Sequence, residues 1–202
     1  MRRIALLAFL VMLFLTAAAS AAERVPLRVA QLPLRVQSCY QPSQQVIDGL
    51  ERQVDRSLHV PLNETLKAVE FIPERQCLAA LAETADEVGG KPRLKDIVKP
   101  LAAMLLADLV VVPVVTGYEQ YTYMSWNWRR GQILHSYAAV QIVGYDRKKD
   151  EVFKKEGSRR YDDEYMPSGE VTRLVAEAMD DALREAAVHD RVWSWKTNIK
   201  CE

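Results

Sequence analysis

Residues 109–115 (LVVVPVV) and 132–145 (QILHSYAAVQIVGY) decide the fold of this 202-residue chain. The first run is almost continuously β-branched, which predicts a strand buried on both faces. Pro113 interrupts it and cannot donate to a ladder, so we expect a bulge or a sheet edge there. The second run alternates as a long strand, and the charged turn 146–150 (DRKKD) leads into a third, more polar strand over 151–161. Together they predict an antiparallel meander.

The remaining segments predict helices that alternate with strands. Strands are expected over residues 27–36 and 66–72, and helices over 43–58, from Pro73 to Gly89, from Pro92 onward with an internal Pro100, and from Pro167 to about Ala186. The order is therefore βαβααβββα. Right-handed crossovers favour parallel pairing in the first half. We expect one α/β (α+β) domain, with a single mixed sheet of about five strands and helices packed on it.

The first 22 residues indicate export. Arg2 and Arg3 precede an apolar run over residues 4–15, and small residues at 16–22 offer Ala19-Ser20-Ala21 as a cleavage site. This is the pattern of a secretory signal peptide. The alternative is a membrane anchor, but the run is shorter than the ~20 residues that a spanning helix needs. We therefore expect a signal peptide at 1–22, a single domain at 23–202, a periplasmic or secreted location, and no membrane span in the mature chain.

Charge and cysteine content narrow the function. Basic and acidic residues are equal at 27 each, so the basic excess typical of nucleic-acid binding is missing. Neither a CxxC nor an HxxxH pair occurs, and the sequence indicates no metal site and no cofactor. Cys39 follows the first strand and Cys77 begins the helix after the second. If those strands are parallel neighbours, both cysteines lie beyond the same sheet edge and are candidates for a disulfide, with Cys201 left over.

Three segments carry a resemblance to known envelope proteins. They are RVAQLPL at residues 28–34, the Ala107-Asp108-Leu109-Val110 entry to a strand, and VQIVGYDRKKDEVF at residues 140–153. The chain resembles the periplasmic domain of the curli secretion-channel lipoproteins, the lipoprotein activators of penicillin-binding proteins, and the amino-terminal domain of the Tol-system propeller protein. It lacks a cysteine at the cleavage site and a match to a pore hairpin. The resemblance implies a small periplasmic α/β fold and partner binding or assembly without catalysis.

The most unusual segment is aromatic and spans residues 118–128. Its large side chains are Tyr118, Tyr121, Tyr123, Met124, Trp126 and Trp128. In a strand, Tyr121 and Tyr123 face one side, while Met124 and the two tryptophans face the other. One interpretation is a recognition surface for a protein, peptide or glycan, because Tyr and Trp are enriched at interface hot spots. The other is ordinary core beneath the last helix.

No motif specifies a reaction. His135 lies in an apolar strand and is interpreted as a hydrogen-bonded structural residue, and Ser136 points to the opposite face. The acidic run 162–164 is interpreted as a solvated loop, and neither GxSxG nor a glycine-rich phosphate loop occurs. The sequence therefore favours an exported, non-enzymatic adaptor or assembly module with an envelope protein as partner. The alternatives are an exported hydrolase-like enzyme with a dispersed site, and a module that binds a small ligand or a glycan.

Overall fold

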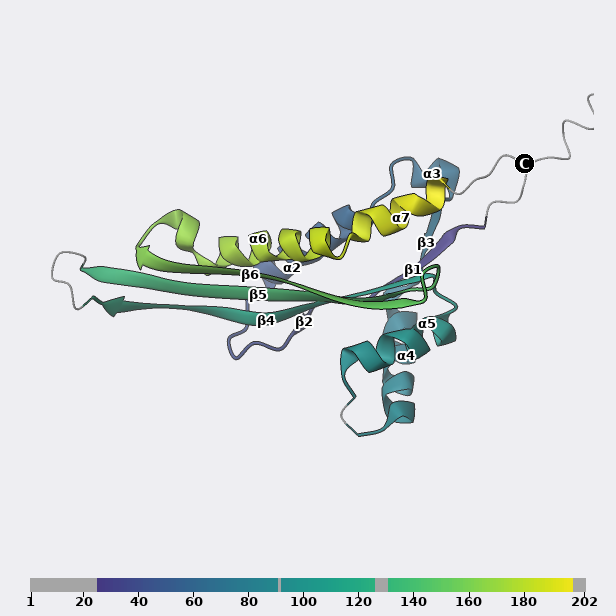
Figure 1. Cartoon of the computed structure of the whole chain (residues 1–202), viewed down its shortest axis with the longest axis horizontal. Coiled ribbons are helices and arrows are strands. Elements are labelled where there is room, and N and C mark those ends of the chain that lie inside the picture. Colours follow the sequence, from purple (N-terminus) through teal and green to yellow (C-terminus); the bar gives the residue numbers. More distant parts are fainter. Residues whose placement is uncertain (1–24, 91, 126–130, 198–202) are drawn as a thin grey trace, which may run out of the picture.

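The computed structural model describes residues 25–90, 92–125 and 131–197 (Figure 1). The expected signal peptide, Trp126, Trp128 and Cys201 lie outside these ranges. None of the helices within them is long and apolar enough to cross a membrane.

One mixed sheet organises the described chain, as the sequence predicted. Its strand order is β3-β1-β4-β5-β6, and a short β2 lies beside β4. The strands are β1 (Leu27–Gln31), β2 (Arg35–Val36), β3 (Val69–Phe71), β4 (Leu109–Met124), β5 (Gln132–Asp146) and β6 (Glu151–Glu164). β1 pairs in parallel with β3 and β4, whereas β4, β5 and β6 form the antiparallel meander.

Pro113 is accommodated at a break in the neighbouring strand. The predicted strand over residues 27–36 is divided into β1 and β2, and both parts pair with β4. Leu32 N donates to Val111 O and Gln37 N donates to Val115 O, so alternate residues of β4 direct their backbone groups to this side. Pro113 therefore faces the gap between β1 and β2, where no ladder needs a donor. The register shift of β4 lies just beyond, between Val115 and Gly117.

Helices cover the two faces of the sheet unequally (Figure 1). One face carries α2 (Gln44–Leu58) and α6 (Val171–Glu185), followed by α7 (Val188–Thr197). The opposite face carries α4 (Glu74–Val88) and α5 (Leu94–Leu105), which lie only near the start of β4. Two short elements, α3 (Asn63–Leu66) and the 3-10 turn η2 (Pro167–Gly169), complete the described chain.

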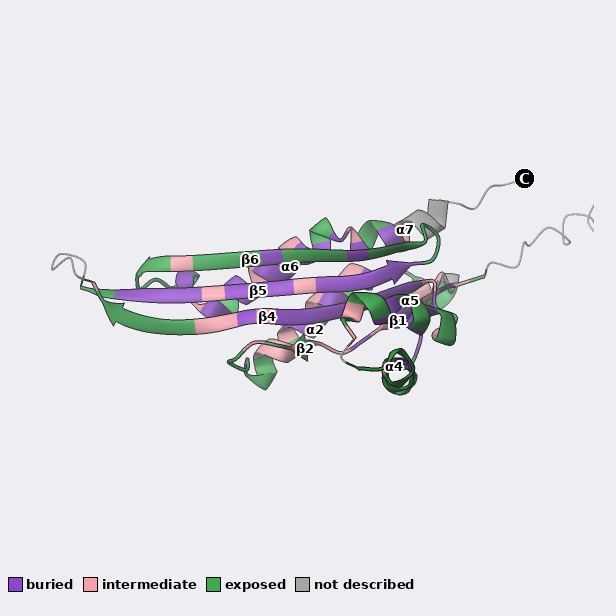
Figure 2. Cartoon of the chain, turned by 60° about the horizontal axis from the view of Figure 1, so that its bottom comes forward, coloured by how far each residue is buried: buried purple, intermediate pink, exposed green. Residues whose placement is uncertain are grey.

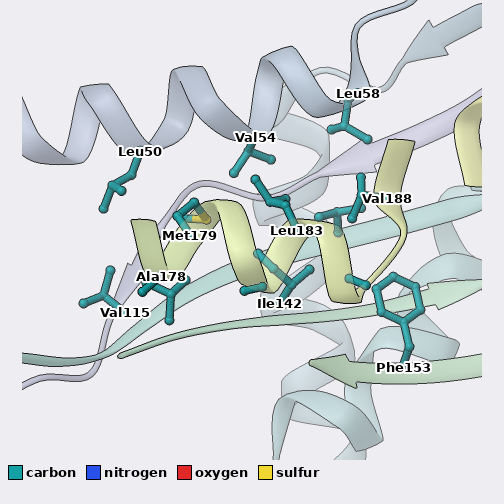
Figure 3. Close-up of a cluster of buried hydrophobic side chains, with 14 of the residues drawn as sticks. Leu50, Val54, Leu58, Val115, Ile142, Phe153, Ala178, Met179, Leu183 and Val188 are labelled. Carbon is teal, nitrogen blue, oxygen red and sulfur yellow. The ribbon is translucent and has the colours of Figure 1, made fainter. Parts of the chain in front are cut away.

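The larger core lies between α2, α6 and the meander (Figure 3). Leu50, Val54 and Leu58 recur along one side of α2 and meet Met179 and Leu183 of α6. The chain passes so close to α6 at β6 that a Cβ on Gly157 would stand 2.1 Å from Ala178 O. Only glycine lets the helix approach the strand at this distance. A second core lies beneath α4 and α5.

A buried ion pair fixes α7 to the β5–β6 hairpin. Arg191 Nη1 lies 2.8 Å from Asp146 Oδ2, and its Nη2 lies 3.0 Å from Glu151 Oε2. The Arg191 guanidinium also lies over the Phe153 ring, 4.2 Å from its centroid. Arg191 and Asp146 are only 8% and 4% exposed. The sequence indicated no structure for this segment, because α7 lacks a continuous apolar stripe.

The structure separates the two cysteines expected to pair. Both thiols are free, and Cys39 is exposed while Cys77 is buried. Cys77 Sγ donates to Ile72 O at the end of β3, whereas the Ser38 hydroxyl, next to Cys39, donates to Tyr118 O. The nine residues of β4 between the level of β3 and Tyr118 span about 30 Å, and a disulfide needs Cα atoms within about 7 Å. β1 and β3 are parallel neighbours as expected, but β2 carries the chain away before Cys39.

Candidate functional site

Part of one sheet face extends beyond α4 and α5 and is covered by no described helix (Figures 1 and 2). We call it the open face and define it by a grid of nine side chains from three paired strands. Its three rows are Glu119–Tyr137–Arg160, Tyr121–His135–Asp162 and Tyr123–Ile133–Glu164. Because side chains alternate along a strand, all nine project to the same side. In Figure 2 the ends of β4 and β6 are exposed here, while β5 between them is largely buried.

Two tyrosines of β4 form the exposed aromatic part of the open face. Tyr121 stacks on His135 with ring centroids 4.7 Å apart, and Tyr123 lies 6.3 Å from Tyr121. Tyr121 and Tyr123 remain 53% and 43% exposed, whereas His135 and Ile133 are buried. The two rings therefore cover part of the strand beneath them and still present aromatic surface to a partner.

Asp162 fixes the position of this aromatic pair. The Tyr123 hydroxyl donates to Asp162 Oδ1 at 2.8 Å, Arg160 Nη2 donates to Oδ2 at 3.2 Å, and His135 Nδ1 lies 3.7 Å from Oδ1. The hydrogen bond from Tyr123 lowers the pKa of Asp162, and the same bond raises the pKa of the phenol. Asp162 is therefore held as a carboxylate and Tyr123 as a neutral donor.

This arrangement favours contact with another surface over the enclosure of a substrate. The aromatic rings lie on the sheet with their exposed sides outward. The hydrogen bond to Asp162 restricts Tyr123, and stacking on His135 restricts Tyr121. Tyrosine contributes large contact area with few rotatable bonds, so little conformational entropy is lost when it is buried at an interface. The described residues contain no cluster of three or more His, Cys, Asp or Glu that could hold a metal ion.

The structure divides the predicted aromatic set between the two faces of β4. Tyr121 and Tyr123 share the open face, as the alternation predicted. Tyr118 faces the other side, is half-buried, and packs against the core beneath α2 and α6, where desolvation raises its pKa. Core packing thus describes Tyr118, whereas Tyr121 and Tyr123 have the exposure that a recognition surface requires. Trp126 and Trp128 lie outside the described residues.

The contact between His135 and Asp162 is not evident from the sequence pattern. The acidic run at 162–164 was expected in a solvated loop, but β6 continues to Glu164 and places Asp162 opposite His135. The charged hairpin turn could have revealed this contact, because it sets the register in which β5 and β6 pair. Extending the Asp146–Glu151 pair outward by eleven positions, from 146 to 135 and from 151 to 162, reaches this pair. The sequence predicted the turn but gave no reason to continue the strand past residue 161.

A separate crevice lies where β1 and β3 end. It has a volume of about 450 Å³, and its polar lining includes Gln31, Glu51, Asp55 and His59. The carboxyl ends of parallel strands are a common ligand position in α/β sheets. Two of its carboxylates already have partners, since Glu51 accepts from Leu34 N at 3.1 Å and Asp55 accepts from the Gln31 amide at 2.5 Å. Glu74 also lines the crevice. Glu51 and Asp55 hold the loop after β1 against α2, which gives these two side chains a structural role.

Comparison with known proteins gives similarities of fold and no sequence family. No family matches the sequence, and no curated protein matches it. Lipoprotein GNA1162 from Neisseria meningitidis is 17% identical with a TM-score of 0.38, over 80% of this chain and 99% of that one. The hypothetical protein CT253 from Chlamydia trachomatis is 16% identical with a TM-score of 0.44, over 84% and 99%. The LpoB C-terminal domain from Salmonella enterica is 11% identical with a TM-score of 0.36, over 71% and 90%. These similarities concern the fold alone.

Proposed function

We propose that this chain is an exported, non-enzymatic envelope protein that binds a protein partner through its open face. One observation carries the proposal: Tyr121 and Tyr123 are held in fixed positions by His135 and Asp162 while remaining about half exposed. Buried packing does not require this arrangement, because no described helix lies over the two rings. Exposed, oriented tyrosines are typical of interface hot spots.

The charges around the tyrosines favour a partner segment with basic side chains. The grid carries Glu119, Asp162 and Glu164 against a single cation, Arg160. Asp162 is engaged by Arg160 and Tyr123, whereas Glu119 and Glu164 form no ion pair with any described residue. A Lys or Arg side chain laid across the tyrosines would meet ring faces and one of these carboxylates together.

Export is the first part of the proposal to test. Intact-mass measurement of the protein released from the periplasm of a bacterial host should give a chain that begins near Ala22 or Glu23. Retention of residues 1–15 in the exported species would contradict the location that we propose.

The interface is tested by crosslinking and substitution. A photo-crosslinking amino acid at position 121 should trap a partner in the native envelope, and the identified partner is then purified for a direct binding measurement. Tyr121→Ser and Tyr123→Ser are each expected to weaken that binding by at least about tenfold, because truncating an interface anchor typically removes about 2 kcal/mol. Tyr40→Ser is the matched control, since Tyr40 is exposed on a loop outside the open face.

Folding and binding are measured separately on every variant. The proposal requires weaker binding with only a small change in Tm, because both rings are about half exposed. Unchanged affinity in both variants would contradict it. A large fall in Tm with loss of binding only in proportion to unfolding would show that the tyrosines serve the fold.

A further inference from the structure

Four basic side chains line one groove between the sheet and the beginning of α5. They come from four positions in the chain: Arg35 in β2, Arg93 and Lys95 at the start of α5, and Lys154 in β6. The groove has a volume of about 490 Å³ and no acidic side chain in its lining. Its floor includes Val114 and Val143 of the sheet.

Internal ion pairs do not explain this concentration of charge. None of the four side chains forms an ion pair with any residue in the described part of the chain. The nearest carboxylate along the same strand face, Glu156, accepts a hydrogen bond from Gln141 at 2.9 Å. All four cations are exposed, so no packing requirement places them together. Four like charges in one groove repel each other, and a bound anion offsets that repulsion.

The N-terminus of the helix beside the groove adds a positive contribution, which Asp96 in its first turn partly offsets from outside the groove lining. α5 is 12 residues long, and its N-cap residue Arg93 makes no side-chain capping hydrogen bond. The first backbone N–H groups of a helix lack intrahelical acceptors and carry a partial positive charge. Arg93 and Lys95 flank this end of the helix, and Arg35 and Lys154 approach from the sheet.

We propose that this groove binds a ligand with a phosphate group that carries more than one negative charge. Arginine guanidinium groups match phosphate oxygens in a fork, lysines add point charges, and a helix N-terminus suits the same group. A volume of about 490 Å³ accommodates a small phosphoester head group. The site is distinct from the open face and does not depend on it, so either proposal can fail without the other.

Titration with inorganic pyrophosphate tests the groove directly. The exported mature chain is titrated by calorimetry at constant ionic strength, which is maintained with sodium chloride. Saturable binding is expected. Arg93→Gln/Lys95→Gln should weaken it by about tenfold for each cation that contacts the anion, or about a hundredfold if both do. The control is Arg52→Gln/Arg56→Gln, which removes two exposed arginines from α2 and leaves the groove intact.

The outcomes separate a specific site from general electrostatic attraction. The control should stay within about twofold of the unmodified protein, and both double variants should retain its Tm. Amide NMR shifts on adding pyrophosphate should concentrate at residues 93–97. An absence of saturable binding, or equal weakening by the groove and control variants, would overturn the proposal.

A lipid head group and a free phosphoester share this chemistry, and vesicles distinguish them. Flotation compares vesicles of phosphatidylcholine alone with vesicles that also contain phosphatidylglycerol. Retention on the anionic vesicles that the groove variant loses and the control keeps identifies a lipid source. Pyrophosphate binding in the groove without vesicle retention identifies a free phosphoester. Vesicle retention that both double variants lose equally would show non-specific attraction and contradict a lipid role for the groove.

Discussion

Arg191→Met should destabilise the protein more than any other single arginine substitution in the C-terminal helices. The change removes a cation that contacts Asp146, Glu151 and the Ala186 carbonyl while keeping a long apolar side chain over Phe153. Asp146 would remain buried with a negative charge and without its cationic partner. Breaking a buried ion pair on one side typically costs about 3–5 kcal/mol.

The lower end of that range is the better expectation here. Asp146 Oδ1 also accepts from the backbone N–H groups of Lys148 and Lys149, at 3.0 and 3.3 Å, and these bonds survive the substitution. We therefore expect a loss of about 3 kcal/mol in the free energy of unfolding. For a domain of this size, that corresponds to a fall in Tm of roughly 6–12 °C.

Urea unfolding followed by circular dichroism measures this loss, and two further variants test its cause. Arg184→Met is the matched control: its partner Asp181 lies on the same helix, and its side chain is 76% exposed, so a loss within about 1 kcal/mol is expected. Arg191→Met/Asp146→Asn removes both charges and should be more stable than the sum of the single losses predicts. A loss below about 1 kcal/mol for Arg191→Met, or additive losses in the double variant, would refute this reasoning.

Three other substitutions or probes test the fold and the open face. Gly157→Ala places a methyl group against the α6 backbone and should lower the free energy of unfolding by about 1–3 kcal/mol, whereas Gly49→Ala, in open space, should not lower it in urea unfolding. Tyr123→Phe should raise the pKa of Asp162 toward its ordinary value in a carboxyl-carbon NMR titration; an unchanged pKa would contradict the hydrogen bond. The pKa of Asp162 is lower in the folded than in the unfolded state. The ionised carboxylate therefore contributes fully to folding stability above the ordinary carboxyl pKa, and this contribution is lost as the pH falls through the folded-state pKa. Cys77 should react with iodoacetamide only in denaturant, since it is buried and burial raises the pKa of its thiol; rapid labelling of the native protein would contradict its position.

The sheet could be predicted because its pattern is local. The β-branched run at residues 109–115 and the alternation at 132–145 each required burial of a particular face, and a charged turn joined the second run to β6. The division of the first strand could not be predicted in this way. It depends on β4, whose paired residues lie 79 or 80 positions further along the sequence, since β1 and β2 each pair with a different part of that strand. For the same reason Cys39 lies away from the position expected for it, because β2 carries the chain along β4 before this residue.

The open face depends on how far the helices cover each side of the sheet, which the sequence pattern does not indicate. Tyr118, Tyr121 and Tyr123 are the same residue type in one strand. Alternation alone indicates only that Tyr118 faces the opposite side of the sheet from the other two. The extent of helix coverage decides which side is core. α6 begins at Val171, where Val171 N donates to Gln120 Oε1 at 2.8 Å, so this helix covers the Tyr118 side almost to the end of the meander. On the other side α5 lies near the start of β4, and the same strand is left with an exposed aromatic face.

The two proposed surfaces lie on one side of the same sheet and have opposite chemistry. From His135 on the open face to Gln141 beside the basic groove is six residues along β5, or about 20 Å. Charges at that separation are largely screened at physiological ionic strength, where the Debye length is about 8 Å. An anion in the groove should therefore alter the electrostatic potential at the tyrosines very little.

A partner that extended along the sheet would still reach both surfaces, with basic side chains near Glu119 and phosphate or other acidic groups near Lys154. The groove variant then separates the two cases. If one partner spans both surfaces, Arg93→Gln/Lys95→Gln weakens its binding as Tyr121→Ser does, and if the sites serve different ligands, only the open-face variant does so.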